Sequence, residues 1–475
     1  MNALRNIVFA CVCLYLIYFL TPPPLLFIFS TDITSTQIFF FSLPIYFISL
    51  LNCTMFSLRN IYIRTNPIKL FTSRFTPLRQ TKITRKFSQK YTLNMRALAY
   101  YKKKDIHYAE DLPEPRINSP NELIIDVAFC GICGSDLHEY TDGPIFLPKD
   151  GETHPLSNSK LPQPMGHEMT GIVREIGSDV TKVKVGDHVV IEAGCGCKDL
   201  SRWPNSKYYG SEQCSACAAG LDNCCEHAGF TGLGVVGGGF AERVVVGEYH
   251  TVPLPKEIPL DIGCLVEPLS VVWHALKLAN FKAKKSALVL GSGPIGLASV
   301  LALKAMGASQ IVVSEPAKIR RDFAEKLNVT VFDPAKHGAN AVEELRKLSI
   351  SGNGFDYAFD CSGIRATFET GLQAITYRGS LVNVAIWGKT VDFDPMEVTL
   401  QEKHFTGSIG YVVEDFEEVV AAIHRRDIKV DEIRHLITGK VNIKDGWEKG
   451  FLELMNHKET NVKILLTPNN HHELN

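Results

Sequence analysis

Residues 286–316 read SALVLGSGPIGLASVLALKAMGASQIVVSEP, and this stretch decides the fold of much of the second half of the chain. An apolar run is followed by a glycine-rich turn, an apolar stretch of helical length and a second apolar run. The same alternation continues through FDYAFDCSG (355–363), GSLVNVAIWG (379–388) and HFTGSIGY (404–411). Apolar runs that alternate with helical patterns are typical of a parallel sheet with helices on both faces. We therefore predict an α/β domain of this kind over residues 269–412.

The glycine-rich turn contains a G-x-G-x-x-G motif between the first apolar run and the helical stretch. Its residues are Gly291, Gly293, Pro294, Ile295 and Gly296. Gly291 permits a tight turn, Gly293 lets the backbone approach a pyrophosphate, and Gly296 lets the helix pack closely on the strand. The N-terminus of the helix then faces the anion. In this strand–helix context the motif predicts a Rossmann domain that binds a dinucleotide.

An acidic residue at the end of the second apolar run indicates which dinucleotide is bound. Glu315 follows that run, 19 residues after Gly296. A carboxylate there accepts hydrogen bonds from a ribose 2′-hydroxyl and repels a 2′-phosphate, which favours NAD over NADP. Arg320 and Arg321 follow closely in the sequence and weaken this preference. Arg320 is kept as a candidate cofactor-binding residue.

The residues on either side of this domain show a different pattern. Residues 165–192 consist of short apolar segments separated by Gly-Ser and Gly-Asp turns, and residues 121–134 read as a strand that runs into a glycine-rich turn. Short segments with frequent turns are typical of a mostly β domain. We predict that residues 95–268 and 413–475 together form such a domain.

The first 94 residues differ in composition from the rest. Residues 7–20 and 38–51 are apolar runs, the second interrupted by a proline, and each is shorter than the roughly 20 residues of a spanning helix. Residues 59–90 contain nine basic and no acidic residues, the chemistry of a mitochondrial transit peptide. Three interpretations stay open for residues 1–94: a membrane anchor, a targeting segment, or a spurious upstream extension with Met95 as the true start. We favour the last and expect no stable fold.

Charge is distributed unevenly along the 475 residues, whose formal net charge is −1. Residues 1–94 hold ten of the 50 basic residues but only one of the 51 acidic residues. The remainder therefore carries 40 bases and 50 acids, a net charge of −10. An acidic body argues against a nucleic-acid partner, and the length allows two or three domains.

The 13 cysteines cluster at short spacings in a large chain, which favours metal ligands over disulfides. In FCGICGSDLHEY, the pair Cys130 and Cys133 fits a redox dithiol, a zinc knuckle or part of a catalytic metal site. Further candidate ligands are His167, Glu168 and Glu267. A catalytic zinc takes thiolate, imidazole and carboxylate ligands and keeps one open position. The spacing of these residues in the sequence does not show that they bind one metal, so the proposed ligand set rests on residue type.

A second group of cysteines has a sharper pattern. Cys214, Cys217 and Cys225 form a C-x2-C-x7-C series, with Cys195 and Cys197 upstream. Three or four thiolates on one polar loop are typical of a closed structural zinc site, which pins a loop that has no core of its own. We choose Cys197 as the fourth ligand, with Cys195 as the next candidate. Scattered free thiols are the alternative.

Motifs spread over residues 95–470 resemble the zinc-containing medium-chain alcohol and polyol dehydrogenases. In the order of that family they read GICGSDLHEY, MGHEMTGIV, VKVGDHVV, GGGFAERVVV, LVEPLSVVWHA, VLGSGPIGL and LQEKHFTGSIGYVVE. Within the family, the butanediol dehydrogenases of the yeast type are most similar. The resemblance implies a GroES-like catalytic domain beside the Rossmann domain. It also implies hydride transfer between NAD and a vicinal diol or hydroxyketone of the 2,3-butanediol/acetoin type.

The resemblance assigns roles to the candidate metal ligands. It makes Cys133 and His167 ligands of a catalytic zinc, and it places Cys130 in the core. Glu168 and Glu267 supply the carboxylate side of this site, and the inner ligand of the two is left open.

The resemblance also implies a proton relay through Ser135 and His138 to solvent. One departure from the family concerns the second cysteine group. Ser211 stands where the family's first cysteine of that group falls, and KDLSRWPNSKYYGSEQ is inserted upstream.

Other functions stay open from the sequence. A threonine- or sorbitol-type zinc dehydrogenase would have the same ligand set and differ in its pocket. A non-catalytic structural or binding protein on this fold is the alternative from another class, and the intact ligands and glycine turn argue against it. We expect a homo-oligomer, either dimer or tetramer, with a cytoplasmic body. A mitochondrial or membrane-associated location is expected only if residues 1–94 are real.

Overall fold

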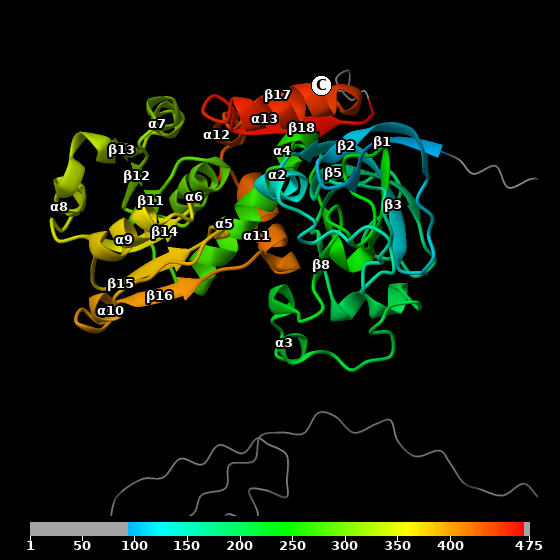
Figure 1. The fold of residues 1–475 in the computed structure, drawn as a ribbon, viewed down its shortest axis with the longest axis horizontal. Coiled ribbons are helices and arrows are strands. Elements are labelled where there is room, and N and C mark those ends of the chain that lie inside the picture. Colours follow the sequence, from blue (N-terminus) through cyan, green and yellow to red (C-terminus); the bar gives the residue numbers. More distant parts are fainter. Residues whose placement is uncertain (1–93, 470–475) are drawn as a thin grey trace, which may run out of the picture. The chain divides into compact units, whose positions relative to one another are not determined.

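The computed structural model describes residues 94–469 of the chain. The interpretations of residues 1–93 fall outside this range. Within the described residues, no helix combines the length and apolar character that crossing a membrane requires. Two large sheets dominate this part of the chain (Figure 1).

The predicted parallel sheet is confirmed. Across the described residues its strand order is β13-β12-β11-β14-β15-β16, and all neighbouring strands are parallel. The strands are β11 (Ser286–Leu290), β12 (Gln310–Ser314), β13 (Thr330–Phe332), β14 (Phe355–Asp360), β15 (Ile375–Asn383) and β16 (His404–Gly407). The order reverses at β11, which lies between β12 and β14. Ligands of doubly wound sheets bind at the carboxyl ends of the strands at such a reversal.

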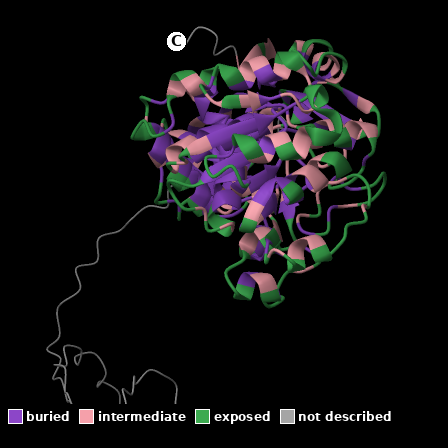
Figure 2. Cartoon of the chain, turned by 90° about the vertical axis from the view of Figure 1, so that its left-hand side faces the viewer, coloured by how far each residue is buried: buried purple, intermediate pink, exposed green. Residues whose placement is uncertain are grey.

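Helices cover both faces of this sheet, as predicted. They are α5 (Val266–Leu278), α6 (Pro294–Ala305), α7 (Lys318–Glu325), α8 (Ala341–Leu348), α9 (Arg365–Ala374) and α10 (Met396–Thr399), with the 3-10 turns η4 (Pro334–Lys336) and η5 (Gly338–Asn340). Along β11, Ala287 and Val289 belong to the core shared with α5 and α6, whereas Leu288 and Leu290 pack in the core with α9. Burial on both faces explains the unbroken apolar run of β11 (Figure 2).

The mostly β part of the chain is also present. Its main sheet has the order β10-β6-β5-β3-β18-β17 with β9 paired to β3, and a smaller sheet has the order β2-β1-β4. Its strands are β1 (Asn94–Lys102), β2 (Asp105–Pro113), β3 (Glu122–Gly131), β4 (Gln163–Pro164), β5 (Glu168–Ile176), β6 (His188–Ile191), β9 (Arg243–Gly247), β10 (Thr251–Pro253), β17 (Ile437–Asn442) and β18 (Lys463–Thr467). Because β18 pairs with β3, strands from the two ends of the described chain lie in one sheet.

Shorter elements connect these strands. Between β3 and α5 they are α2 (Gly134–Thr141), β7 (Gly194–Cys195), η1 (Cys197–Arg202), α3 (Ser215–Ala218), η2 (Asp222–Cys224), β8 (Gly229–Phe230), η3 (Glu248–His250) and α4 (Leu260–Gly263). Between β16 and β18 they are α11 (Val413–His424), α12 (Val430–Arg434), η6 (Ile443–Asp445), η7 (Gly446–Phe451) and α13 (Leu452–Asn456). Leu269 of α5 and Phe416 of α11 share one core cluster. The hydrophobic core therefore continues from residues 269–412 into residues 413–475. The domain boundaries at these positions remain a prediction.

Candidate active site

Three candidate metal ligands that are distant in the sequence lie together at one end of β3 and β5. Cys133 directly precedes α2, His167 directly precedes β5, and Glu168 is the first residue of β5. The antiparallel register places Gly131 opposite Glu168, which brings Cys133 close to His167. One ligand atom of each of the three residues lies within 4.8 Å of the other two. We call this set the catalytic cluster.

Asp136, in the first turn of α2, supports two members of the catalytic cluster. Its Oδ2 accepts a hydrogen bond of 2.8 Å from the backbone N–H of Cys133, and its Oδ1 lies 3.5 Å from Nδ1 of His167. Its side chain is fully buried. Burial opposes a charged imidazole, but Asp136 and Cys133 outweigh it and raise the pKa of His167. Asp136 therefore lies on the Nδ1 side of the imidazole, which leaves Nε2 on the side of the cluster.

Lys463, from β18, supports the third member. Its Nζ lies 2.5 Å from Oε1 of Glu168 and donates a hydrogen bond of 3.1 Å to the carbonyl of Ile132. Burial opposes the charge of this buried amine, but Glu168 and Cys133 outweigh burial and raise the pKa of Lys463. The ion pair therefore holds the Glu168 carboxylate in place beside Cys133 and His167.

The donor set of the catalytic cluster fits a zinc ion. The cluster offers a thiol, an imidazole and a carboxylate, which are the groups that zinc takes, and three protein ligands leave one position for substrate. The second carboxylate oxygen of Glu168, Oε2, is buried and has no hydrogen-bond partner among the described residues. An unpartnered buried carboxylate oxygen is costly unless a cation or a further donor meets it.

Glu267 lies beside the catalytic cluster but is not one of the three residues whose ligand atoms lie within 4.8 Å of one another. It is in the first turn of α5 and is buried. Burial and the neighbouring Glu168 raise the pKa of Glu267 to about 7. Tyr411 is a further neighbour; burial and the Glu267 carboxylate raise the pKa of its hydroxyl. Glu267 and Tyr411 thus border the position that a substrate would take.

The two predicted relay residues both lie on α2 but differ in exposure. Oγ of Ser135 lies 3.3 Å from Nε2 of His167, next to the catalytic cluster. His138 is exposed, and its Nδ1 lies 3.4 Å from Oδ2 of Asp142. No hydrogen bond between Ser135 and His138 occurs in the described part of the chain. Ser135 is therefore placed at the cluster and His138 at the surface.

The glycine turn has the geometry that its sequence predicts. Gly293 is the N-cap of α6, Pro294 is its first residue, and Ile295 follows. Gly291 has a φ of +97°, which disfavours any residue with a side chain. A Cβ at Gly296 would lie 2.0 Å from the carbonyl oxygen of Gly291, so only glycine fits. The N-terminus of α6 follows the carboxyl end of β11, where a pyrophosphate would bind.

Glu315 is anchored at the end of β12. Its Oε2 accepts a hydrogen bond of 3.0 Å from the backbone N–H of Ser292, and its Oε1 accepts one of 2.9 Å from that of Ala317. The carboxylate is buried against the glycine turn. Oε2 also accepts a hydrogen bond of 3.4 Å from Oγ of Ser292, whereas Oε1 keeps a further lone pair, which suits a hydrogen bond from a ribose hydroxyl.

The two arginines of α7 have different surroundings. Arg320 donates a hydrogen bond of 2.9 Å to the carbonyl of Lys458, and its Nη1 lies 3.9 Å from the position of a Cβ at Gly293. Arg320 therefore lies at the glycine turn. Arg321 forms an ion pair of 2.8 Å with Asp333. Because Asp333 engages Arg321, this arginine is not free to bind a 2′-phosphate.

Four of the predicted structural ligands come together in a separate lobe. Ligand atoms of Cys197, Cys214, Cys217 and Cys225 all lie within 4.8 Å of one another, and all four side chains are buried. The Sγ of Cys225 lies 3.9 Å from that of Cys214 and 3.7 Å from that of Cys197. Tetrahedral zinc with bonds of about 2.3 Å separates its sulfurs by roughly 3.8 Å. These four cysteines, the four-cysteine cluster, therefore fit zinc.

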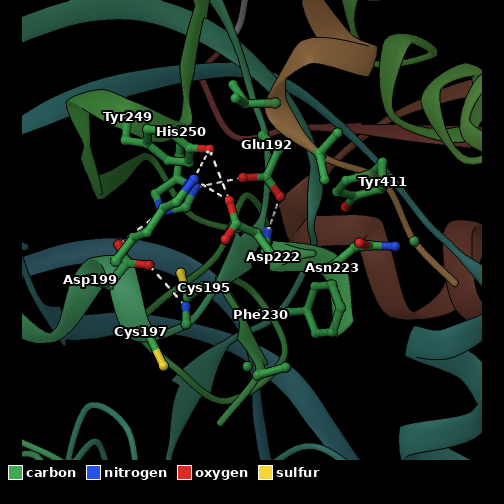
Figure 3. Close-up of a pocket in the computed structure, with 18 of the residues that line it drawn as sticks. Glu192, Cys195, Cys197, Asp199, Asp222, Asn223, Phe230, Tyr249, His250 and Tyr411 are labelled. Carbon is green, nitrogen blue, oxygen red and sulfur yellow. Dashed lines mark hydrogen bonds and ion pairs between the residues drawn. The ribbon is translucent and has the colours of Figure 1, made fainter. Parts of the chain in front are cut away.

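Cys195 belongs to a third group, with Asp199 and His250, that borders a small pocket (Figure 3). Nδ1 of His250 lies 2.5 Å from Glu192 and Nε2 lies 2.8 Å from Asp199, which also binds Arg202 at 2.8 Å. Burial opposes the charge of His250, but the two carboxylates raise its pKa to about 10. Both ring nitrogens of His250 are therefore engaged by carboxylates, and neither is free to bind a metal. This third group is therefore a buried ion-pair network.

Sequence reasoning missed three residues of the site. Asp136 has a local signal, since an acidic residue three positions after the N-cap is typical of a capping box. Lys463 is a charge at the start of the apolar run of β18, which is unusual unless the charge is paired. Tyr411 carries no distinguishing signal in the sequence.

Comparison with known families assigns both halves of the described chain. Residues 119–256 match a family described as "Alcohol dehydrogenase GroES-like domain". Residues 294–425 match a family described as "Zinc-binding dehydrogenase". The predicted pairing of a GroES-like domain with a Rossmann domain is therefore confirmed.

Individual relatives agree with the family matches. The (R,R)-butanediol dehydrogenase of Saccharomyces cerevisiae is 64% identical over 381 residues, which cover 80% of this chain and 100% of that protein. A probable (R)-acetoin-forming diacetyl reductase of the same yeast is 51% identical over 383 residues, covering 80% of this chain and 92% of that protein. The crystal structure of 2R,3R-butanediol dehydrogenase from Bacillus subtilis matches with a TM-score of 0.70 and 37% identity, covering 79% of this chain and 100% of that chain.

Proposed function

We propose that this chain, which belongs to the zinc-binding dehydrogenase family, transfers a hydride between NAD and a vicinal diol or hydroxyketone of the 2,3-butanediol/acetoin type. The observation that carries the chemistry is the catalytic cluster, in which Cys133, His167 and Glu168 lie within 4.8 Å of one another. The substrate class rests on the 64% identical yeast butanediol dehydrogenase, which is matched over its full length.

The residues of the catalytic cluster would hold the zinc ion through Sγ of Cys133, Nε2 of His167 and the carboxylate of Glu168. Zinc bound there polarises a substrate oxygen and lowers the pKa of its hydroxyl group. Asp136 holds the imidazole of His167 in the tautomer that leaves Nε2 free to bind. Lys463 holds the carboxylate of Glu168 through a buried ion pair. The chain thus orients each ligand before the metal arrives.

Proton removal from the substrate hydroxyl is assigned to Ser135. Its hydroxyl lies 3.3 Å from Nε2 of His167, and it is therefore close to any group that occupies the open position of the cluster. His138 is one helical turn away and faces solvent, so it is assigned the exit of the proton. An imidazole titrates in the range that such an exit requires.

The preference for a vicinal diol is assigned to the groups that border the catalytic cluster. Glu267 is buried beside Glu168, and Tyr411 is its neighbour. The second hydroxyl of a diol can donate a hydrogen bond to the Glu267 carboxylate. A substrate without that hydroxyl would leave a buried carboxylate unpaired, which is unfavourable.

The dinucleotide is assigned to the glycine turn. Its pyrophosphate would meet the N-terminus of α6 at Gly293, Pro294 and Ile295, with Arg320 beside the turn. Glu315 would accept hydrogen bonds from the ribose and disfavour a 2′-phosphate, which supports NAD over NADP. The four-cysteine cluster is assigned a second, structural zinc.

A homo-oligomer, dimer or tetramer, is proposed as the assembly. β16 forms an outer edge of the parallel sheet. Phe405 within it is 44% exposed, and Leu400 and Ile409 on either side are 73% and 49% exposed. An apolar strand edge of this kind is suited to pairing with a second copy of the chain. Light scattering of the purified protein tests this, and a monomer would contradict it.

The body of the chain is assigned to the cytoplasm. The cysteines of the described part are free thiols, many of them grouped as ligands, which suits a reducing compartment. A mitochondrial or membrane-associated location is proposed only for a protein that retains residues 1–94 as a targeting segment or anchor. Peptide mapping of the N-terminus of the native protein distinguishes these cases.

The test of the function is NADH formation by the full chain with each stereoisomer of 2,3-butanediol, with sorbitol and with threonine. Each reaction is run with and without prior removal of metal by a chelator. We expect oxidation of a butanediol isomer that the chelator abolishes and zinc restores. Activity on sorbitol or threonine alone would keep the mechanism and replace the substrate class. Activity that survives complete removal of zinc would contradict the assigned role of the catalytic cluster.

A further inference from the structure

Asn223 connects the loop of the four-cysteine cluster to the rest of the molecule. It lies in η2, between Cys217 and Cys225. Its side-chain amide nitrogen, Nδ2, donates a hydrogen bond of 2.9 Å to the carbonyl of Ile409 and lies 3.1 Å from Nε2 of His274. The side-chain amide of Asn223 thus contacts two segments that lie far from it in the sequence.

The position of Asn223 depends on the four-cysteine cluster. The four cysteines form a small core of their own, and among the described hydrophobic residues only the partly buried Ala216 packs against it. The neighbouring Asp222 forms an ion pair with Lys198, and Lys198 also donates a hydrogen bond of 2.7 Å to the hydroxyl of Tyr249. Because the loop has little apolar core beyond its cysteines, whatever holds the sulfurs together also holds Asn223 in place.

The hydrogen bond to His274 reaches the helix that carries Glu267. Both residues are on α5. Nδ1 of His274 lies 2.8 Å from Oδ2 of the fully buried Asp415, so Nδ1 carries the proton and Nε2 accepts from Asn223. The same Oδ2 of Asp415 accepts a hydrogen bond of 2.9 Å from the backbone N–H of Val412. Asn223, His274 and Asp415 thus form one chain of hydrogen bonds.

The hydrogen bond to Ile409 reaches the segment that carries Tyr411. Residues 409–413 run from β16 into α11, and Val412 is the N-cap that Asp415 holds. Asn223 and Asp415 therefore fix this segment on both sides of Tyr411. The side chain of Tyr411 is 5% exposed and neighbours Glu267 at the catalytic cluster.

A small pocket of about 50 Å³ lies at this junction (Figure 3). One part of its wall comes from the lobe of the four-cysteine cluster, including Cys197 and Asn223, and another comes from residues 409–413. Figure 3 shows Asn223 and Tyr411 on one side of the pocket and His250 on the other. Tyr411 and Val413 pack in the core on one side of this segment, and the hydrogen bond from Asn223 to Ile409 holds the segment where it borders the pocket.

We infer that Asn223 is a positioning residue through which the four-cysteine cluster sets the placement of Tyr411 and Glu267 beside the catalytic cluster. The inference rests on the proposed function for its substrate. It gives the structural cluster a role in substrate recognition besides local stability.

Asn223→Asp in the full chain is the sharpest test, because it keeps the size of the side chain and removes both hydrogen-bond donors. We expect KM for the butanediol isomer to rise about tenfold, the effect of losing two hydrogen bonds that position the pocket. kcat and the affinity for NAD should change less than about twofold, a split that follows if the cofactor and zinc sites are intact. Zinc content should equal that of the wild type.

Hydrogen exchange gives a readout independent of activity. In Asn223→Asp, backbone amides of residues 409–415 should exchange faster, whereas those of residues 197–222 should be unchanged. Cys224→Ser is the matched control, because Cys224 is the exposed neighbour outside the four-cysteine cluster and should behave as wild type. Asn223→Ser retains one donor and should give a smaller rise in KM, which also serves if Asn223→Asp folds poorly.

Two results would overturn the inference. One is wild-type KM together with wild-type exchange in both Asn223 variants. The other is loss of zinc with faster exchange throughout residues 197–225, which would make Asn223 a support of its own loop only. If the full wild-type chain oxidises no diol, the proposed substrate fails. The exchange of residues 409–415 then still decides whether Asn223 positions this segment.

Discussion

The catalytic cluster and the four-cysteine cluster hold their ligands in place by different physical means. In the catalytic cluster, the paired strands β3 and β5 set the positions, and Asp136 and Lys463 each support a ligand. In the four-cysteine cluster, no carboxylate or lysine side chain of the described residues is hydrogen-bonded to a sulfur. The sulfurs lie against one another and against backbone N–H groups. The first cluster is organised by the core, whereas the second is itself the core of its loop.

This difference implies that the two metal sites of the chain have different roles, one in catalysis and the other in stability. A site organised by the core can lose its metal and keep its shape, so its metal is free to serve chemistry. A site that forms its own core loses its shape with its metal, so its metal serves stability. Each of the following predictions can break or sharpen this comparison.

The largest effect is expected from Cys133→Ser. The rate of NADH formation should fall about a thousandfold or more, because a Lewis acid supplies several kcal/mol of transition-state stabilisation. The midpoint of thermal unfolding should move by less than about 2 °C, because Asp136 and Lys463 still hold the site. Steady-state rates, calorimetry and NAD titration check this. A large loss of stability would show that the catalytic cluster also depends on its metal for shape.

Cys217→Ser should act mainly on stability, whereas Cys133→Ser acts mainly on the rate of NADH formation. We expect the free energy of unfolding to fall by on the order of 3 kcal/mol, because losing a structural metal ligand is among the more damaging single changes. Limited proteolysis should cut the loop of residues 197–225 first. Affinity for NAD should be retained, and Cys224→Ser is the control. Unchanged stability together with full zinc content would remove Cys217 from the ligand set.

Asp136→Asn should produce an intermediate effect on the catalytic cluster. The side-chain oxygen can still accept the N–H of Cys133, but the amide donates to Nδ1 of His167 and favours the tautomer with a proton on Nε2. That proton blocks the ligand position, so zinc affinity and turnover should fall roughly 10–100-fold. Zinc titration and kcat measurements check this. Wild-type zinc affinity would show that the carboxylate does not set the tautomer.

The smallest expected effect is a pH dependence of stability caused by His154. This histidine is buried, and a Cβ at Gly229 of β8 would lie 2.9 Å from its Cε1. Burial lowers the pKa of His154 to about 4. His154 in the unfolded chain therefore binds a proton as the pH falls through about 6.5, whereas His154 in the folded chain stays neutral until the pH approaches 4. Stability should be full above pH 6.5 and fall by on the order of 1–2 kcal/mol as the pH drops toward 4.

Urea unfolding at pH 7 and pH 5 measures this slope, with His154→Asn as the matched control. Asparagine keeps an acceptor for the backbone N–H of Leu156, which lies 3.3 Å from Nδ1 of His154, and it does not titrate. The variant should lose less stability between the two pH values than the wild type. Equal losses would assign the pH dependence to other groups.

The sequence predicted the coenzyme part of the fold well because its signals are local. The turn from Gly291 to Gly296 lies between two apolar runs, and each element can be recognised within about 30 residues. Residue types and local spacing also singled out Cys214, Cys217 and Cys225 as one group. These features need no knowledge of how distant strands pair.

The candidate active site could be predicted only in part, because it depends on strand register. The residue types of Cys133 and His167 suggested ligands, but only the pairing of β3 with β5 brings them together. Lys463 could not be connected with Glu168, which lies 295 positions earlier. The resemblance implied that His138 leads to solvent, but the local sequence did not, since a helix position alone does not tell which partner a side chain meets.

The pairing of β18 with β3 has a consequence for biosynthesis. Lys463 belongs to one of the last strands to be made, yet it supports Glu168 in the first half of the chain. The parallel sheet of residues 286–407 is continuous in the sequence and can fold while synthesis proceeds. The sheet around β3 must wait for β18, so it is completed after the parallel sheet has been made. A ribosome that stalls before residue 463 therefore yields a chain with a formed nucleotide fold and an unfinished catalytic sheet, a ready target for quality control.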